Sequence, residues 1–338
     1  MRSLGHDVVV FAPEDGELSK RLKEKDSEVD IVNFQWSKNA YWNPFFLWSL
    51  KKLFRQKNID VMIYNALIDV RVAAYIAKQA GVGSNIYRVG MPVAPKLDWS
   101  YRRAFQKGLD LIVSNSHESL KIIKRDAKDM IGTEVSCHVI TNGVNLEIFK
   151  PRPQDLREGE PLTFGNCSRL SHQKGLDLFL QVCHKLKVEH KCHYLAILGG
   201  GGEEESNLTQ LKAELELDEQ VEMIGFVAQA EKFYSNLDFL LFTSRFEGAS
   251  NTIIESFACG VPVIAFDTSS MSEMIEHGKN GFLVPAFDID QMSHYARELL
   301  MDRNKCRQMG EFARETALKY YDQNKIQKQW EELILSTK

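Results

Sequence analysis

Short apolar segments recur along the whole chain, each six to eight residues long and separated by longer amphipathic stretches. Continuous runs rich in Val, Ile, Leu and Phe predict strands that are buried on both faces, as in parallel sheets covered by helices. The segments of the front half lie at 7–13, 29–34, 59–65, 84–90, 109–115 and 136–143. Those of the back half lie at 162–168, 193–200, 221–226, 237–244, 261–266 and 281–286.

The strand–helix rhythm therefore occurs twice, and a polar segment with three prolines at 150–161 separates the two sets. Such a segment is typical of a linker, and 338 residues suit about two domains. We expect an α/β protein of two doubly wound, Rossmann-like parallel-sheet domains facing across a cleft. The front domain would cover 1–150 and the back domain 151–319.

The first residues, MRSLGHDVVVFAP, resemble the last turn of a helix, a stop at Gly5 and then a strand. In a doubly wound sheet the first strand is usually central. Its absence would leave interior N–H and C=O groups unpaired, at about 1–3 kcal/mol each. We therefore expect roughly one strand–helix unit to be missing before this point. The alternative is that the gap is closed in a way the sequence does not show.

Charge is distributed unevenly along the chain. Residues 1–150 carry 22 Lys/Arg and 17 Asp/Glu, whereas the whole chain carries 42 and 46. The basic front half could face an anionic acceptor or a membrane surface, and uneven solvated faces are the plain alternative. Six cysteines without a CxxC pair fit a reducing cytoplasm. No apolar run approaches the ~18 residues of a spanning helix.

The unusual residues of the back half follow its apolar runs, where parallel sheets bind ligands. Arg169 and Lys174 supply positive charge suited to phosphate oxygens. The small residues 248–250 open a helix whose free N–H groups attract an anion. The flanking acids, Glu247 and Glu255, could accept hydrogen bonds from a sugar and a ribose. Two cations and a helix start could stabilise a diphosphate without a metal, so we predict a nucleotide-sugar site.

Each of these residues also has a simpler interpretation. The pattern Thr252-x-x-Glu255 is a capping box, so Glu255 could only cap its own helix. Arg169, Lys174 and Glu247 taken singly could be solvated charges. Asp288 and Asp290 form an Asp-x-Asp pair, but they precede a helix, where Asp favours capping. We expect no metal site and no cofactor.

In several stretches the chain resembles the retaining glycosyltransferases of the large family-four group (group 1), which have the GT-B architecture. Within 246–267 the stretch FEGASNTIIESFACGVPVIAFD carries a Glu-x7-Glu element, and SRLSHQKGLDLFL at 168–180 carries Arg-x4-Lys. The other similar stretches lie at 140–151, 195–208, 221–227 and 276–284. The front half matches weakly. The family has a glycine-rich loop after its first strand, which this sequence lacks, so the chain could bind donor yet transfer poorly.

The resemblance implies a role for each matching residue. Arg169 and Lys174 would stabilise the departing diphosphate, Glu255 would hold the ribose, and Glu247 would lie beside the transferred sugar. The remaining donor-binding residues would be Gly248, Ala249, Ser250, Asn251, Thr252, Asn142 and Gly143, with Phe226 and Val227 at the base. The resemblance further implies transfer with retention of anomeric configuration, no required metal, and a final helix at 320–338 that crosses back onto the front domain.

We therefore expect a cytoplasmic glycosyltransferase that uses a nucleoside-diphosphate sugar, most often a UDP-sugar in this family. Its acceptor would be a polysaccharide, a lipopolysaccharide or a lipid-linked saccharide. The aromatic, basic segment 40–58 could dock on anionic lipid, or pack as an ordinary helix. Nucleic acid is not an expected partner. Two alternatives stay open: a nucleotide-sugar-binding partner subunit without turnover, and a UDP-sugar epimerase of GT-B fold.

Overall fold

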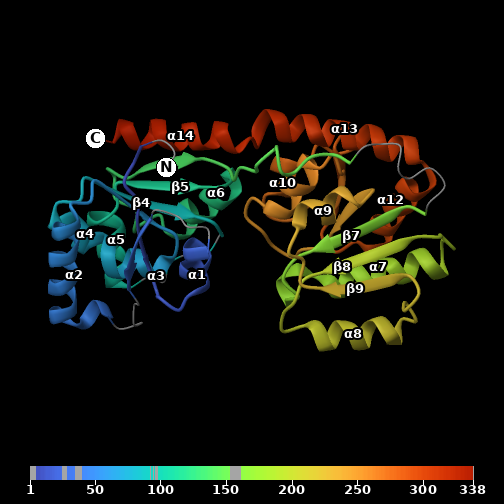
Figure 1. The fold of residues 1–338 in the computed structure, drawn as a ribbon, viewed down its shortest axis with the longest axis horizontal. Coiled ribbons are helices and arrows are strands. Elements are labelled where there is room, and N and C mark those ends of the chain that lie inside the picture. The colour runs from blue at the N-terminus through green and yellow to red at the C-terminus, as the bar shows by residue number, and fades with distance from the viewer. Residues whose placement is uncertain are drawn as a thin grey trace.

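The computed structural model describes residues 5–24, 29–34, 40–91, 93, 95, 98–152 and 161–337. These residues form two α/β bodies that lie side by side (Figure 1). Each of the predicted apolar segments becomes a parallel strand, and the expected GT-B class of α/β fold is confirmed.

One six-stranded parallel sheet organises the back domain, with the order β12-β11-β10-β7-β8-β9. The chain order therefore reverses between β7 and β10, which places the loops after these two strands at a topological switch point. The bounds of the strands are β7 (Thr163–Cys167), β8 (Leu195–Gly199), β9 (Val221–Gly225), β10 (Phe239–Phe242), β11 (Val263–Phe266) and β12 (Gly281–Val284).

Both faces of this sheet are covered by helices, which explains why its strands are continuously apolar. In β10, Phe239 and Leu241 join the core on one face, and Leu240 and Phe242 join the core on the other. The first core packs under α7 (Leu176–Val188), α8 (Glu205–Glu214) and α12 (Ile289–Met301). The second packs under α9 (Ala230–Ser235), α10 (Asn251–Ala258), α11 (Met271–Met274) and α13 (Arg303–Tyr320).

The front domain divides its strands between two sheets. Strands β3 (Val61–Tyr64), β4 (Ser84–Val89), β5 (Leu111–Ser114) and β6 (Ser136–Val139) form one parallel sheet in that order. Strands β1 (Val9–Ala12) and β2 (Asp30–Asn33) form a separate parallel pair. Within the described residues β1 and β3 are therefore both at a sheet edge.

Several helices surround the front sheets: α1 (Glu17–Glu24), α2 (Pro44–Lys57), α3 (Leu67–Asp69), α4 (Tyr75–Ala80), α5 (Trp99–Lys107) and α6 (His117–Asp126). A π-helical turn over Val70–Ala74 joins α3 to α4, and a 3-10 turn over Ala40–Trp42 precedes α2. The start of α2 follows from its sequence, because Asn43 accepts a hydrogen bond from Phe46 N and Pro44 occupies the first helical position.

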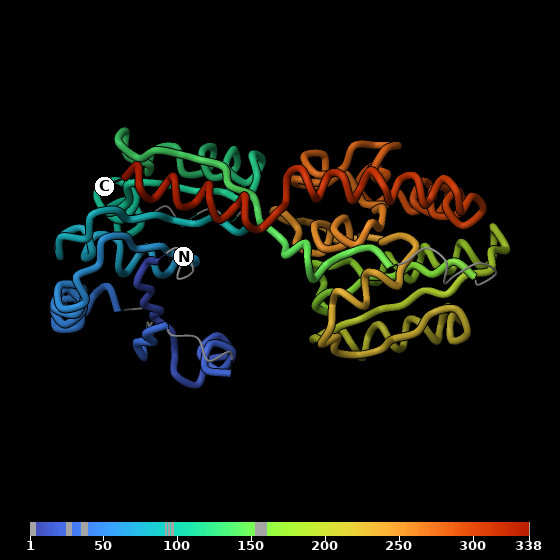
Figure 2. Tube along the Cα trace, turned by 45° about the horizontal axis from the view of Figure 1, so that its top comes forward, coloured from blue at the N-terminus to red at the C-terminus, as the bar shows by residue number. Residues whose placement is uncertain are grey.

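The chain crosses between the domains twice at one place. Val144 N donates to Tyr321 O at 2.8 Å on the outward crossing, and Gln323 N donates to Val144 O at 3.0 Å on the return. Figures 1 and 2 show α13 over the back domain and α14 (Gln323–Ser336) continuing over the front domain. Ile326 and Ile334 of α14 are buried in a front-domain core with β4 and β5. The last helix thus ties the two domains together.

Among the described residues no helix is both long and apolar enough to cross a bilayer.

Candidate active site between the domains

The loops after β7 and β10 are bound to each other at the switch point. Arg245 N donates to Gln173 O at 2.8 Å, and Gln173 Nε2 donates to Phe246 O at 3.0 Å. The Arg245 guanidinium binds both carboxylate oxygens of Asp177 on α7, at 2.9 and 2.7 Å. These bonds hold the Arg-x4-Lys segment against the Glu-x7-Glu segment, as parallel strands that meet at one sheet edge allow.

Within this arrangement Lys174 and Glu247 form an ion pair. Lys174 Nζ lies 2.5 Å from Glu247 Oε1, and their side chains are only 18% and 9% exposed. The pair occupies one of the three ammonium donors of Lys174, so the same group can still reach a phosphate oxygen. Arg169 is exposed and makes no side-chain hydrogen bond or ion pair to any residue that the structure describes. Its guanidinium is free to bind a ligand.

The turn 248–250 leads into α10 without a side-chain cap. Ser250 is the N-cap residue, and its side chain makes no capping hydrogen bond. The first N–H groups of α10 therefore have no partner inside the helix and carry a partial positive charge. Thr252 is the second helical residue and Glu255 the fifth, so they cannot form a capping box, which needs the N-cap and third helical positions. That interpretation of Glu255 is wrong.

Glu255 instead lies in a half-buried position behind the end of β7. Burial raises the pKa of Glu255, a hydrogen bond with Tyr234 offsets part of that rise, and the resulting pKa is about 7. The Tyr234 hydroxyl oxygen also lies 3.3 Å from Cys167 O, at the last residue of β7. Burial and, to a smaller extent, the charge of Glu255 raise the pKa of the Cys167 thiol to about 11. Glu255 is thus a poorly solvated carboxyl group that a hydroxyl donor would stabilise.

The Glu255 carboxyl should make stability depend on pH. Its pKa is about 7 in the folded protein against an ordinary value of 4.5, so the folded protein holds a proton that the unfolded chain releases. This stabilisation is complete below pH 4.5 and is lost as the pH rises through 7. We measure the free energy of unfolding of Glu255→Gln and of wild type in urea at pH 5 and at pH 8. The stability of the variant minus that of wild type should be larger at pH 8 than at pH 5 by roughly 2–3 kcal/mol. An equal difference at both pH values would contradict the assignment.

Asn142 lies where the chain leaves the front domain, and its side chain binds the turn 248–250 of the back domain. Its Nδ2 donates to Ala249 O at 3.1 Å and to Asn251 Oδ1 at 2.8 Å. Gly143 packs against the returning helix, since a Cβ there would lie 2.9 Å from the Cα of Gln323. Of these two sequence-predicted residues, the structure brings Asn142 to the turn and places Gly143 at the crossing.

Gly248 lies in direct contact with the front domain. A Cβ at this position would meet Gly90 O at 2.5 Å and the side chain of Asn115 at 3.0 Å. Asn115 Nδ2 donates to the same Gly90 carbonyl at 3.1 Å, which fixes that surface. On the back-domain side Ser270 Oγ donates to Gly248 O at 2.5 Å. The turn is thus held from both domains.

A second interdomain contact lies beside this one. Glu273 of α11 accepts hydrogen bonds from His117 N at 2.8 Å and Glu118 N at 2.6 Å, the first two residues of α6. The carboxylate thereby completes the helix start that Ser116 caps through Ser119 N.

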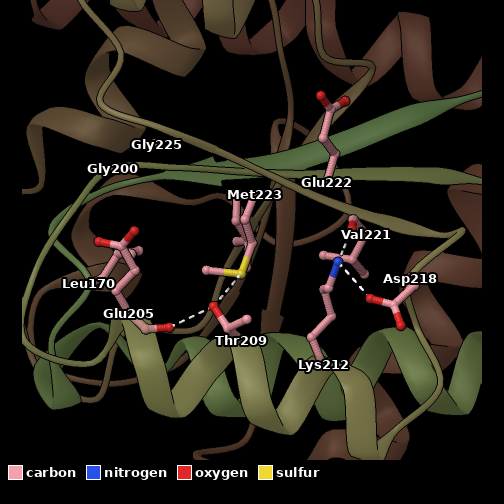
Figure 3. A pocket seen from close by; sticks show the side chains of 11 residues that line it. Leu170, Gly200, Glu205, Thr209, Lys212, Asp218, Val221, Glu222, Met223 and Gly225 are labelled. Atoms are coloured by element: carbon pink, nitrogen blue, oxygen red, sulfur yellow. Dashed lines mark hydrogen bonds and ion pairs between the residues drawn. The ribbon is translucent and has the colours of Figure 1, made fainter.

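Phe226 and Val227 follow β9. Phe226 is 78% exposed and Val227 is half-buried. A neighbouring cavity of about 420 Å³ begins at Gly200 and Gly225 and continues between β9 and α8 (Figure 3). Lys212 crosses its far end and pairs with Asp218 at 2.9 Å. The cavity thus borders the expected base position without containing Phe226.

Within the part of the chain that the structure describes, no group of three or more His, Cys, Asp or Glu side chains could hold a metal ion. The Asp-x-Asp pair behaves as its sequence predicts, because Asp288 is the N-cap of α12 and accepts from Gln291 N at 2.9 Å.

Several residues of this site were not predicted from the sequence. Asn115 follows β5 and Arg245 follows β10, so both occupy strand ends that predict ligand contact. Ser270 and Glu273 lie in no recognisable motif, because their contacts join segments far apart in the chain.

Comparisons with known proteins agree with this architecture. A family model described as "Glycosyl transferases group 1" matches residues 147–316, and one described as "Glycosyltransferase Family 4" matches residues 1–148. Among solved structures, HepE of Anabaena, crystallised with UDP, superposes with a TM-score of 0.81 at 22% identity, covering 97% of this chain and 92% of that chain.

Two proteins of known activity are similar to this chain in sequence over most of its length. N-acetyl-alpha-D-glucosaminyl L-malate synthase of Bacillus anthracis is 23% identical over 93% of this chain and 91% of its own length. N-acetylgalactosamine-N,N'-diacetylbacillosaminyl-diphospho-undecaprenol 4-alpha-N-acetylgalactosaminyltransferase of Campylobacter jejuni is 27% identical over 84% of this chain and 78% of its own length. With both halves of its sequence matched by their models and a GT-B fold, the chain belongs to the family 4 (group 1) glycosyltransferases.

Proposed function

We propose that the protein transfers a sugar from a nucleoside-diphosphate sugar, a UDP-sugar in the first instance, to a polysaccharide or lipid-linked saccharide. The observation that carries this proposal is the Lys174–Glu247 pair beside the uncapped start of α10. HepE was crystallised with UDP and with UDP and glucose, and the Campylobacter relative is named for a diphospho-undecaprenol-linked acceptor. These names support the donor class and the acceptor class proposed here.

In the proposed complex the diphosphate lies against Lys174, Arg169 and the N–H groups that open α10. These positive groups stabilise the charge that develops on the leaving phosphate oxygen, so they can serve where other transferases use a metal. Glu255 accepts from a ribose hydroxyl, and Glu247 accepts from a hydroxyl of the transferred sugar. We further propose that the acceptor attacks from the side of the leaving phosphate, which retains the anomeric configuration.

The test is a donor-consumption assay with a panel of UDP-sugars and prenyl-diphosphate-linked saccharides, run with and without a chelator. We expect UDP release that depends on acceptor and is insensitive to the chelator, and a product with the donor's anomeric configuration. Donor binding without consumption would favour the partner-subunit alternative. Conversion of the donor without any acceptor would favour the epimerase alternative.

We also propose that the front domain docks on an anionic membrane through α2 and its neighbours. Phe45, Trp48 and Trp42 are 84%, 65% and 62% exposed. Trp42 packs edge-on against exposed Trp99 at 5.1 Å, and Lys52 lies over the Trp48 ring at 5.7 Å. Figure 1 places α2 at the end of the front domain away from the back domain. Aromatic rings with basic side chains suit the headgroup region of a bilayer.

Charge complementarity selects anionic lipid as the occupant, because segment 40–58 contains four basic residues and no acid. The free cysteines of the protein fit a place of action on the inner, reducing side of that membrane.

The double variant Phe45→Ser/Trp48→Ser is expected to bind phosphatidylglycerol-containing vesicles at least about tenfold more weakly than wild type in a sedimentation assay. Wild-type binding should decrease with salt and be absent on phosphatidylcholine alone. Met301→Ser, which removes an apolar side chain 71% exposed on the back domain, is the control. Equal binding by the double variant and wild type would exclude this surface.

A further inference from the structure

Arg88 is a half-buried arginine near the carboxyl end of β4, at the surface that faces the back domain. Its Nη2 donates to Asn142 Oδ1 at 2.9 Å, and its Nη1 lies 3.5 Å from Asn65 Oδ1. Burial lowers the pKa of Arg88, but an arginine side chain remains protonated in proteins. The guanidinium is therefore a positive charge whose side-chain hydrogen-bond partners are both neutral amides.

Two other partly buried arginines of this protein have acidic partners. Arg71 pairs with Asp98 at 3.0 Å, and Arg245 pairs with Asp177 at 2.7 Å. Arg314 instead donates to the backbone carbonyls of Phe149 and Ala258. No ion pair among the described residues involves Arg88. A poorly solvated charge without a counter-ion is costly, and an anionic ligand would relieve that cost.

The position of Arg88 indicates what that ligand is. Its partner Asn142 also binds Ala249 O and the side chain of Asn251, the first residue of α10. The guanidinium is thus one side chain away from the helix start proposed to hold the diphosphate, and it comes from the opposite domain. The planar fork of an arginine matches two oxygens of one phosphate group.

We infer that Arg88 is an anion-binding residue that the front domain contributes to this site, where it receives a phosphate oxygen of a substrate. The inference rests on the proposed function, since it adds a third cationic group to the same site. The phosphate belongs either to the donor diphosphate or to a phosphate that links the acceptor to its lipid. A donor phosphate bound there would join the two domains, because Arg88 lies on strand β4 of the front domain and Lys174 lies in the loop after β7 of the back domain.

Two variants separate charge from hydrogen bonding. Arg88→Gln keeps a donor for Asn142 but removes the charge, whereas Arg88→Lys keeps the charge but loses the fork. Calorimetry on the full chain uses UDP, uridine and inorganic pyrophosphate, and then farnesyl diphosphate at saturating UDP. Arg125→Gln removes an exposed charge from the same domain and is the matched control.

If the phosphate is the donor's, Arg88→Gln should bind UDP roughly 10- to 100-fold more weakly with unchanged affinity for uridine. If the phosphate is the acceptor's, UDP affinity should be unchanged and farnesyl diphosphate binding should fall by a similar factor. Arg88→Lys should lie between Arg88→Gln and wild type in either case. A merely structural role through Asn142 predicts the opposite order, with Gln tolerated better than Lys.

An Arg88→Gln variant that binds every probe as wild type does would overturn the inference and leave the proposed function standing. A wild-type protein that binds pyrophosphate through Arg88 but neither UDP nor a UDP-sugar would overturn the proposed function alone.

Discussion

Replacing Glu247 by glutamine is expected to lower the transfer rate by about 10²–10³-fold, while UDP binds as tightly as before. The amide keeps the size of the side chain and can still accept from Lys174, so the donor loop should hold its shape. What it loses is the negative charge that we propose lies beside the transferred sugar. Because UDP lacks that sugar, a loss confined to kcat with an unchanged Kd for UDP identifies Glu247 as a group that acts on the sugar.

Replacing Lys174, the ion-pair partner of Glu247, by methionine should affect both stability and UDP binding. It leaves the Glu247 carboxylate largely buried without its counter-ion, which costs about 3–5 kcal/mol when one member of a buried pair is removed. We expect a lower melting temperature and weaker UDP binding. The double variant Lys174→Met/Glu247→Gln should recover much of the stability but none of the transfer.

Glu276→Gln is the matched control for both experiments, because Glu276 pairs with Lys279 at 3.0 Å in an exposed position of the same domain. Transfer by Glu247→Gln within a few-fold of wild type would remove Glu247 from the reaction.

Gly248→Ala is expected to lower transfer by about 10²-fold while leaving the donor domain folded and able to bind UDP. A single methyl group at this position would lie 2.5 Å from Gly90 O, which belongs to the opposite domain. The backbone of Gly248 is not in the left-handed region, so alanine causes no strain within its own loop. Something must shift to accommodate the methyl group, and we expect the two domains to move apart, which would misplace an acceptor bound to the front domain.

The expected separation can be measured by small-angle scattering of the variant with saturating UDP, beside its rate and its Kd for UDP. Gly201→Ala is the control, because a Cβ at Gly201 in the neighbouring β8 loop meets only the end of the Glu205 side chain at 4.0 Å. If Gly248→Ala transfers at the wild-type rate, contact between these two glycines has no part in catalysis.

Much of the fold could be predicted from local patterns. The strand β10 is recognisable because both of its faces are buried, so that all four residues are apolar. The helix starts at Asn43 and Asp288 are recognisable because each cap bonds a residue three positions later. The carboxyl ends of β7 and β10 are the switch point of the sheet, which is why Lys174 and Glu247 could be expected near one another without any structure.

The pairing inside the site could not be predicted in the same way. The sequence offered Lys174 as a phosphate ligand and Glu247 as a sugar ligand, whereas the structure shows them bonded to each other across 73 positions of the chain. It also offered Glu255 as a cap of its own helix, which requires a helix that begins two residues later than α10 does. Both differences depend on the conformation of the loops after β7 and β10. The spacing of hydrophobic residues predicts strands and helices, but it does not predict loop conformation.

By itself the sequence determined the class of the fold, the doubling of the strand–helix unit and the edge at which the ligand-binding loops meet. These follow from side-chain burial and strand direction, which each short segment expresses locally. Only the tertiary structure decided which charges are neutralised and which are free: Glu247 is paired, Arg88 is left between neutral amides, and Gly248 touches the opposite domain. Such contacts join residues that are distant in the chain, and their energies depend on desolvation and distance, which exist only once both domains are assembled.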